Sequence, residues 1–112
     1  MTSEPQEDAS VRAERRLFNR RKFRGTLEIE WGSTTLKAPV RDLGPQGLFV
    51  ELVPPLWMGA TFSARLDLDP PLQMNCTVCR VEPGTGFAVA FNLPEESAKA
   101  QLEELLAALP RV

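Results

Sequence analysis

Residues 14–47, ERRLFNRRKFRGTLEIEWGSTTLKAPVRDLGPQG, contain the pattern on which the fold prediction depends. Within them, Leu27, Ile29 and Trp31 alternate with acidic residues, which is the period of a half-buried β-strand. A second alternating run, 36–41, follows a Gly-Ser-Thr break of the kind that connects the strands of a hairpin. The sequence therefore predicts an antiparallel hairpin, with a basic segment before it and a glycine-containing corner after it.

The rest of the chain repeats this two-residue period between turn-forming residues. The further alternating runs cover residues 48–52, 62–68, 72–82 and 87–91. Apolar positions slip out of phase near 78–81, which predicts a β-bulge there. Leucines at helical spacing after an acidic first turn predict one helix over 94–109. We therefore expect a mainly β fold, a six-stranded antiparallel barrel with a C-terminal α-helix.

Composition argues against catalysis and against membrane insertion. The 112 residues contain no histidine, the commonest general base and metal ligand. Cys76 and Cys79 form a C-x-x-C in a predicted strand, where their side chains point to opposite faces, and no second pair completes a zinc site. No apolar run approaches the roughly 18 residues that cross a bilayer, and residues 1–10 do not resemble a secretory signal. We expect a cytoplasmic protein that is not an enzyme and holds no metal or cofactor.

Charge is divided unevenly along the chain. Residues 12–24 hold seven basic side chains and one acid, whereas residues 25–112 hold six bases and eleven acids. A short basic segment before an acidic domain favours a focused anion site over the uniformly basic surface of a nucleic-acid-binding protein. We therefore expect an anionic ligand and no DNA.

Two short motifs carry candidate ligand-binding residues. Arg16 and Arg20 are four apart in the basic segment, and guanidinium groups pair bidentately with phosphate and with the guanine edge. Alternatively, a charge run of this kind is a solvated arm without function. The corner Asp42-x-Gly44-x-x-Gly47 is compatible with ordinary turn chemistry. It also suits a planar base, because a carboxylate accepts from guanine N–H groups and glycines expose backbone N–H groups.

The order and spacing of these motifs resemble the PilZ domain family. An R-x-x-x-R precedes the first strand, and an Asp-x-small-x-x-Gly separates the second and third strands. The resemblance covers residues 14–109 and gives the expected organisation. It comprises a disordered tail over 1–13 and a PilZ domain over 14–112, with a ligand-binding arm over 14–24, the barrel over 25–92 and the helix over 94–109.

The resemblance implies a non-enzymatic bacterial receptor for cyclic di-GMP. The ligand contacts it implies are Arg16 and Arg20 from the arm, Asp42, Gly44 and Gly47 from the corner, and Arg15 as an auxiliary contact. Binding would order the arm and alter the surface shown to a protein partner in motility, secretion or biofilm control.

One position departs from the family pattern. Gly44 stands where the family usually has serine, and the lost hydrogen bond is worth roughly 1.5–3 kcal/mol if fully engaged. Weakened binding is expected. Gly44 and the loop that holds Trp57 also support a second hypothesis, an adaptor that binds proteins without nucleotide. A third hypothesis, a barrel for single-stranded nucleic acid, is disfavoured by the acidity of the barrel. Arg20 and Arg24 form an alternative R-x-x-x-R, which is disfavoured because Arg24 falls where the first strand begins.

Overall fold

The structure, a computed structural model, describes residues 20–111. Within this range the chain forms six strands followed by a helix. They are β1 (Arg21–Trp31), β2 (Thr34–Leu43), β3 (Gly47–Val50), β4 (Thr61–Leu66), β5 (Leu72–Glu82), β6 (Gly86–Asn92) and α2 (Glu96–Ala108).

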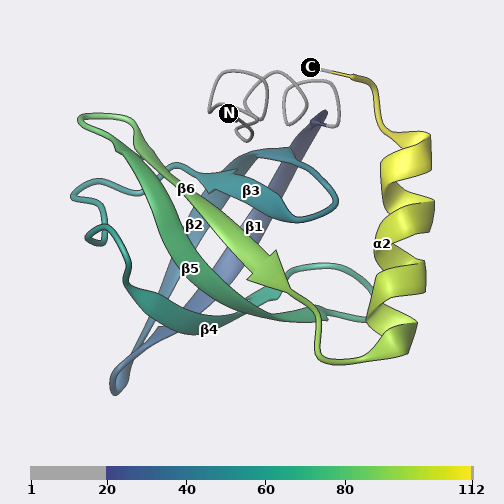
Figure 1. Cartoon of the computed structure of the whole chain (residues 1–112), viewed down its shortest axis with the longest axis horizontal. Helices are drawn as coiled ribbons and strands as arrows, with labels where there is room; N and C mark the ends of the chain where they lie inside the picture. The colour runs from purple at the N-terminus through teal and green to yellow at the C-terminus, as the bar shows by residue number, and fades with distance from the viewer. Residues whose placement is uncertain (1–19, 112) are drawn as a thin grey trace, which may run out of the picture.

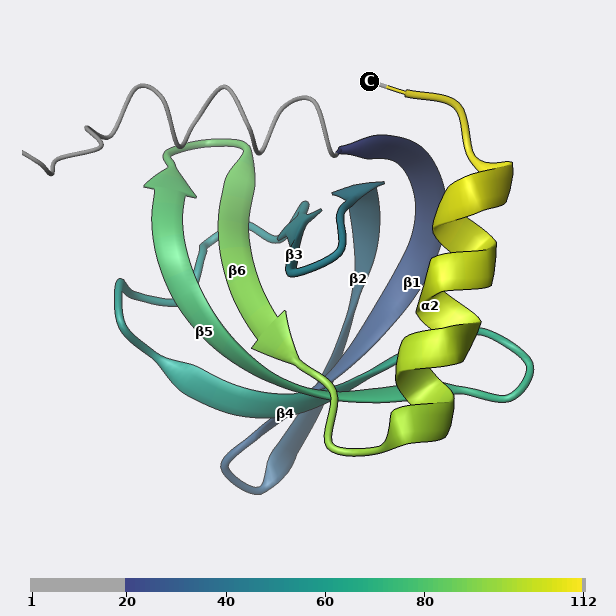
Figure 2. The same cartoon turned by 45° about the vertical axis from the view of Figure 1, so that its right-hand side comes forward.

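The strands close into one antiparallel barrel (Figures 1 and 2), in the order β1-β2-β3-β6-β5-β4. Closure comes from β1, which pairs with β2 along one edge and with β4 along the other. The helix α2 stands beside the barrel after the chain leaves β6. The expected fold class, a six-stranded antiparallel barrel with a C-terminal helix, is confirmed.

Inward-facing apolar side chains fill the barrel. Leu27 and Ile29 of β1, and Ala38 and Val40 of β2, are buried at the alternating positions that the sequence predicts. Ala98 and Leu102 bring one face of α2 into the same core. Burial of this apolar surface is the main source of stability for a domain of this size.

A β-bulge interrupts the two-residue period in β2. Val40 and Leu43 are both buried although they lie three positions apart. Between them, Arg41 and Asp42 occupy the place opposite a single β3 residue, Phe49, where the pairing register shifts. Such an extra residue re-aims the side chains of a strand. Here it directs both Arg41 and Asp42 to the outside of the barrel.

A second bulge lies in β5, at the position that the sequence predicts. The register shifts between Val78 and Arg80, so that Cys79 and Arg80 lie opposite Ala88 of β6. Cys79 is exposed whereas Cys76 is buried, so the two cysteines face opposite sides of the strand as expected. The outer faces of β3 and β6 therefore lie between two strands, β2 and β5, whose bulges direct side chains outward.

The first strand begins earlier than expected, at Arg21 instead of residue 25. Residues 21–24 were expected in the arm, but β2 extends to Leu43 and pairs with Arg21 and Lys22. The N–H of Lys22 also donates to the carbonyl oxygen of Pro110, just beyond α2, at 2.8 Å. The pairing with β2 and the hydrogen bond to Pro110 place this segment in β1, although its sequence has no apolar pattern. The helix begins at Glu96 and ends at Ala108, one to two residues inside the expected limits.

We predict that Gly86→Ala destabilises the barrel more than Gly84→Ala in the same turn. A Cβ at Gly86 would overlap the carbonyl oxygen of Val50, a backbone atom of the paired strand β3. We expect a loss of about 2–3 kcal/mol in the free energy of unfolding, measured in urea.

Gly84 is the matched control, because its φ is +79° but a Cβ there would meet open space. Its replacement by alanine should cost only about 1–2 kcal/mol, through backbone conformation alone. Equal losses in the two variants would contradict the close packing of β3 on β6.

Candidate functional site

An ion pair between Arg20 and Asp42 lies on the outer face of the barrel. Nη1 of Arg20 donates to Oδ1 of Asp42 at 2.6 Å, and the two side chains are only 16% and 14% exposed. Arg20 immediately precedes β1, and Asp42 pairs with Lys22 in the adjacent strand. The structure thus brings together one arginine of the basic segment and the carboxylate of the corner. A charge-assisted contact of this length is among the stronger hydrogen bonds in proteins.

A second arginine, Arg41, approaches the same carboxylate. Its Nε donates to Oδ2 of Asp42 at 3.4 Å, and its Nη1 lies 3.8 Å from Oε1 of Glu82. Its guanidinium carbon lies 3.7 Å from the centroid of the Phe49 ring. The sequence reasoning did not select Arg41. A signal was present, because inward-facing Val40 and Leu43 are separated by two residues where strict alternation allows only one.

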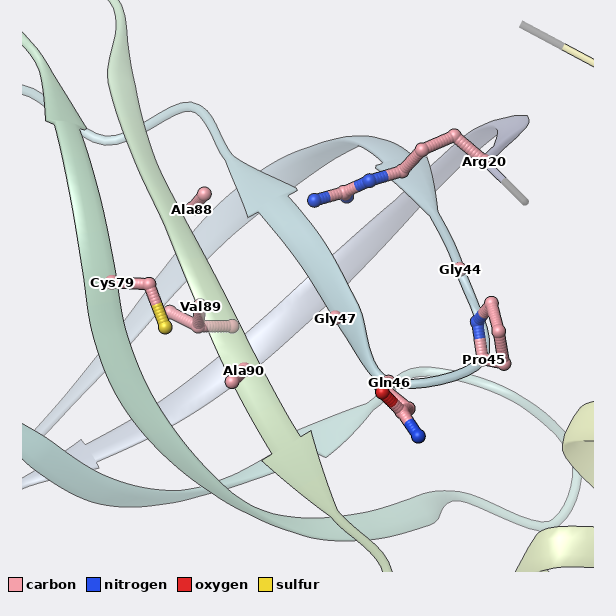
Figure 3. Close-up of a pocket in the computed structure, with 9 residues that line it drawn as sticks. All are labelled: Arg20, Gly44, Pro45, Gln46, Gly47, Cys79, Ala88, Val89 and Ala90. Atoms are coloured by element: carbon pink, nitrogen blue, oxygen red, sulfur yellow. The ribbon is translucent and has the colours of Figure 1, made fainter. Parts of the chain in front are cut away.

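A small pocket opens beside Arg20 (Figure 3), over β3 and β6. Its lining residues are Arg20, Gly44, Pro45, Gln46, Gly47, Cys79, Ala88, Val89 and Ala90. Gly47 pairs with Ala90, and Ala88 lies on the same outer face two positions along β6. We call Gly47, Ala88 and Ala90 the small-residue platform. With hydrogen or methyl side chains, these residues leave the backbone surface open to a flat ligand.

The pocket measures about 120 Å³. This is below the roughly 300–1,000 Å³ of typical small-molecule sites. It has room for one ring system of a larger ligand, so the remainder would contact the surrounding surface.

The two glycines of the corner have different structural roles. A Cβ on Gly47 would lie 2.6 Å from the carbonyl oxygen of Val89 and 3.8 Å from Nη2 of Arg20. Glycine at this position therefore allows the close approach of β6, whereas a Cβ would make only an ordinary contact with Arg20. The N–H of Gly44 donates to the carbonyl oxygen of Gly47 at 2.8 Å. This N–H closes the corner, so it is not among the backbone N–H groups that the corner offers to a ligand.

The β5 bulge forms the far side of the pocket. Cys79 lines it, and the neighbouring Arg80 donates from Nη2 to Oε2 of Glu82 at 2.9 Å. Glu82 therefore lies between Arg80 and Arg41, two arginines from opposite sides of the platform. The charged side chains of the site therefore form one series of alternating sign, in the order Arg20, Asp42, Arg41, Glu82 and Arg80.

The remaining predicted residues are placed only in part. Arg15 and Arg16 lie outside the described residues, and their contribution to the site stays a prediction. Arg24 of the alternative R-x-x-x-R is mostly exposed and lies 3.4 Å from Glu51 instead of Asp42. Among residues 20–111, no group of three or more potential metal ligands gathers. No helix in this range is long and apolar enough to span a bilayer.

We predict that a thiol reagent labels Cys79 but not Cys76 in the folded chain. Burial raises the pKa of the Cys76 thiol to about 12, so this thiol remains protonated and shielded at mildly alkaline pH. Cys79 is exposed at the pocket. Mass spectrometry after iodoacetamide treatment should find one label per folded chain and two after unfolding in guanidinium. Equal labelling of both residues in the folded chain would contradict the inward orientation of Cys76.

Comparison with known families matches residues 14–108 to the PilZ domain. A comparison with curated proteins finds no match. PilZ domains are non-catalytic receptor domains, and the family generally binds cyclic di-GMP. The matched segment covers the barrel, all of α2 and both candidate motifs. The chain belongs to the PilZ domain family.

Proposed function

We propose that this chain is a non-enzymatic receptor that binds cyclic di-GMP on the small-residue platform. The observation that carries the proposal is the Arg20–Asp42 pair, a cation and a carboxylate held together at the edge of a pocket with a flat floor. Both partners suit guanine and its phosphates. Arginine donates to phosphate oxygens or to guanine O6 and N7, and a carboxylate accepts from guanine N1–H and N2–H.

In the unliganded chain, the two groups satisfy each other. Arg20 is a planar fork with several donors, of which Nη1 faces Asp42 and Nη2 lies near Gly47 at the pocket floor. Ligand binding exchanges this internal pair for two ligand contacts, phosphate with Arg20 and a guanine edge with Asp42. After the exchange each group has a partner on the ligand, so neither group is left buried without one.

The small pocket suggests how much of the ligand the platform holds. One guanine ring covers Gly47, Ala88 and Ala90, and the phosphates lie toward the start of β1. Arg15 and Arg16, which precede Arg20 in the chain, then add cations on the phosphate side of the ligand. This division assigns the base to the barrel and the phosphates to the basic segment.

A route for output leads from Arg20 to the end of α2. Two residues after Arg20, the N–H of Lys22 donates to the carbonyl oxygen of Pro110. The backbone of Arg21 also forms an isolated antiparallel β-bridge with that of Arg111. A ligand that pulls Arg20 away from Asp42 therefore acts on the segment that anchors the end of the helix. A partner that contacts α2 would respond to this displacement.

A second candidate function, an adaptor that binds proteins without nucleotide, is favoured by one observation. Val53, Trp57 and Met58 of the β3–β4 loop expose large apolar side chains, and Trp57 is 64% exposed. The Trp57 ring packs edge-on against Trp31, with centroids 4.8 Å apart, which holds it in place at the surface. Exposed apolar surface of this kind is found at protein interaction sites. The two functions make different predictions for nucleotide binding.

We predict that Arg20→Met and Asp42→Asn each weaken cyclic di-GMP binding by about ten- to a hundredfold. Loss of one hydrogen bond to a charged group costs roughly 1.5–3 kcal/mol. Isothermal titration calorimetry of the wild type and both variants measures the change. Arg65→Met is the matched control, because Arg65 lies on β4 and pairs with Glu28 instead of with the site.

Wild-type affinity in the Arg65→Met variant, with losses in the other two, would support the proposal. Thermal melts of the three variants check that each one remains folded. Absence of binding heat for the wild-type chain, or equal affinity in Arg20→Met, would contradict it. In that case, partner capture that depends on Trp57 and is insensitive to nucleotide would support the adaptor.

We also predict that Gly44→Ser raises the affinity for cyclic di-GMP by about tenfold. Gly44 lines the pocket and its φ is not positive, so its backbone conformation is one that serine also adopts. A serine hydroxyl adds a donor for the ligand, worth about 1.5 kcal/mol with a charged partner. Gly44→Ala is the control, because it adds the Cβ without the hydroxyl. An equal affinity in the serine and alanine variants would contradict a hydroxyl contact.

A further inference from the structure

Arg41 is held in place on three sides. One face of its guanidinium lies over the Phe49 ring at 3.7 Å. At its edge, Nε donates to Oδ2 of Asp42 at 3.4 Å, and Nη1 lies 3.8 Å from Oε1 of Glu82. The β2 bulge is the cause of this arrangement, because it places Arg41 on the same outer face as Asp42 and opposite Phe49.

One surface of this group remains open. The Arg41 side chain is 37% exposed within the described part of the chain. Because Phe49 covers one face and the two carboxylates lie along the edge, the exposed surface includes the face directed away from Phe49. A guanidinium face, being planar and delocalised, stacks on aromatic rings and nucleobases.

We propose that Arg41 is a third ligand-contacting arginine, and that its open face stacks on a purine ring of the bound nucleotide. The result is a layered arrangement of Phe49, Arg41 and purine at the edge of the small-residue platform. This inference rests on the proposed cyclic di-GMP function and assigns a role to a residue outside both sequence motifs.

Electrostatics favours stacking over a phosphate contact for Arg41. Asp42 and Glu82 already lie within 4 Å of its guanidinium and offset its positive charge. A phosphate at the same edge would have to approach two carboxylates of like charge. A neutral base ring has no such penalty, and the two carboxylates keep the guanidinium plane in position for it.

Two substitutions separate shape from charge. Arg41→Lys keeps the positive charge but removes the plane, and Arg41→Met removes both while retaining an apolar cover for Phe49. Stacking predicts that both variants weaken cyclic di-GMP binding by about tenfold, measured by calorimetry. Arg65→Met again controls for the loss of one surface cation.

Proton NMR of the wild-type chain provides a readout that a structural role would not move. Stacking of a purine above Arg41 shifts its Nε–H proton upfield when cyclic di-GMP is added, whereas a phosphate hydrogen bond shifts it downfield. An upfield shift, with similar losses in both variants, supports the inference.

Wild-type affinity in Arg41→Lys, or a downfield shift, would overturn stacking while leaving the proposed receptor function intact. Binding that is unchanged in both variants would have the same consequence. Absence of any binding by the wild-type chain would instead overturn the proposed function, and this inference with it.

Discussion

The contact between Arg20 and Asp42 depends on an irregularity in β2, and the pairing of β1 with β2 also shifts register nearby, between Lys22 and Gly25. Strict alternation after Val40 would direct Arg41 outward and Asp42 into the apolar interior, where an unpaired carboxylate is costly. The bulge opposite Phe49 adds one residue, so that Val40 and Leu43 both face the core and Asp42 faces outward. The same extra residue places Arg41 beside Asp42. Core packing and the charged site are therefore compatible only because the strand departs from regular pairing.

The site as a whole lies between two such irregularities. The β2 bulge supplies Arg41 and Asp42, and the β5 bulge supplies Cys79 and Arg80. Between them, β3 and β6 present the small-residue platform, which is flat because its outward side chains are hydrogen or methyl groups. A regular barrel thus positions the site, while the residues that depart from regular pairing carry its polar chemistry. Edge charges and a flat apolar floor together match the two chemical parts of a guanine nucleotide.

Much of the fold could be predicted because the alternation of apolar and polar residues along a strand is a local property of the sequence. The inward positions of β1 and β2, the closed barrel, the C-terminal helix and the β5 bulge all follow from alternation and its interruption. The early start of β1 could not be predicted, because it depends on pairing with the end of β2 and on the bond from Lys22 to Pro110. The burial of Phe49 beneath Arg41 could not be predicted either, because Arg41 lies on a different strand. Such contacts across strands leave no periodic signal.

The candidate site could be predicted only where motif spacing points to it. Arg20, Asp42 and Gly47 were selected from two short motifs, and the barrel places all three within one small region. Arg41 belongs to neither motif and became visible only through its contacts. The hydrogen bond of the Gly44 N–H could not be predicted, because a glycine in a corner does not reveal whether its amide is already bonded.

The most direct test of the central claim is a map of backbone amide shifts in ¹⁵N-labelled protein on addition of cyclic di-GMP. The account predicts that the largest shifts fall on the two bulges and the small-residue platform, at Asp42, Gly47, Cys79, Ala88 and Ala90. The amides of the β1–β2 turn at Gly32 and Ser33 should remain unchanged. Shifts centred on the β3–β4 loop, with the two bulges unaffected, would contradict the claim that these irregularities form the binding site.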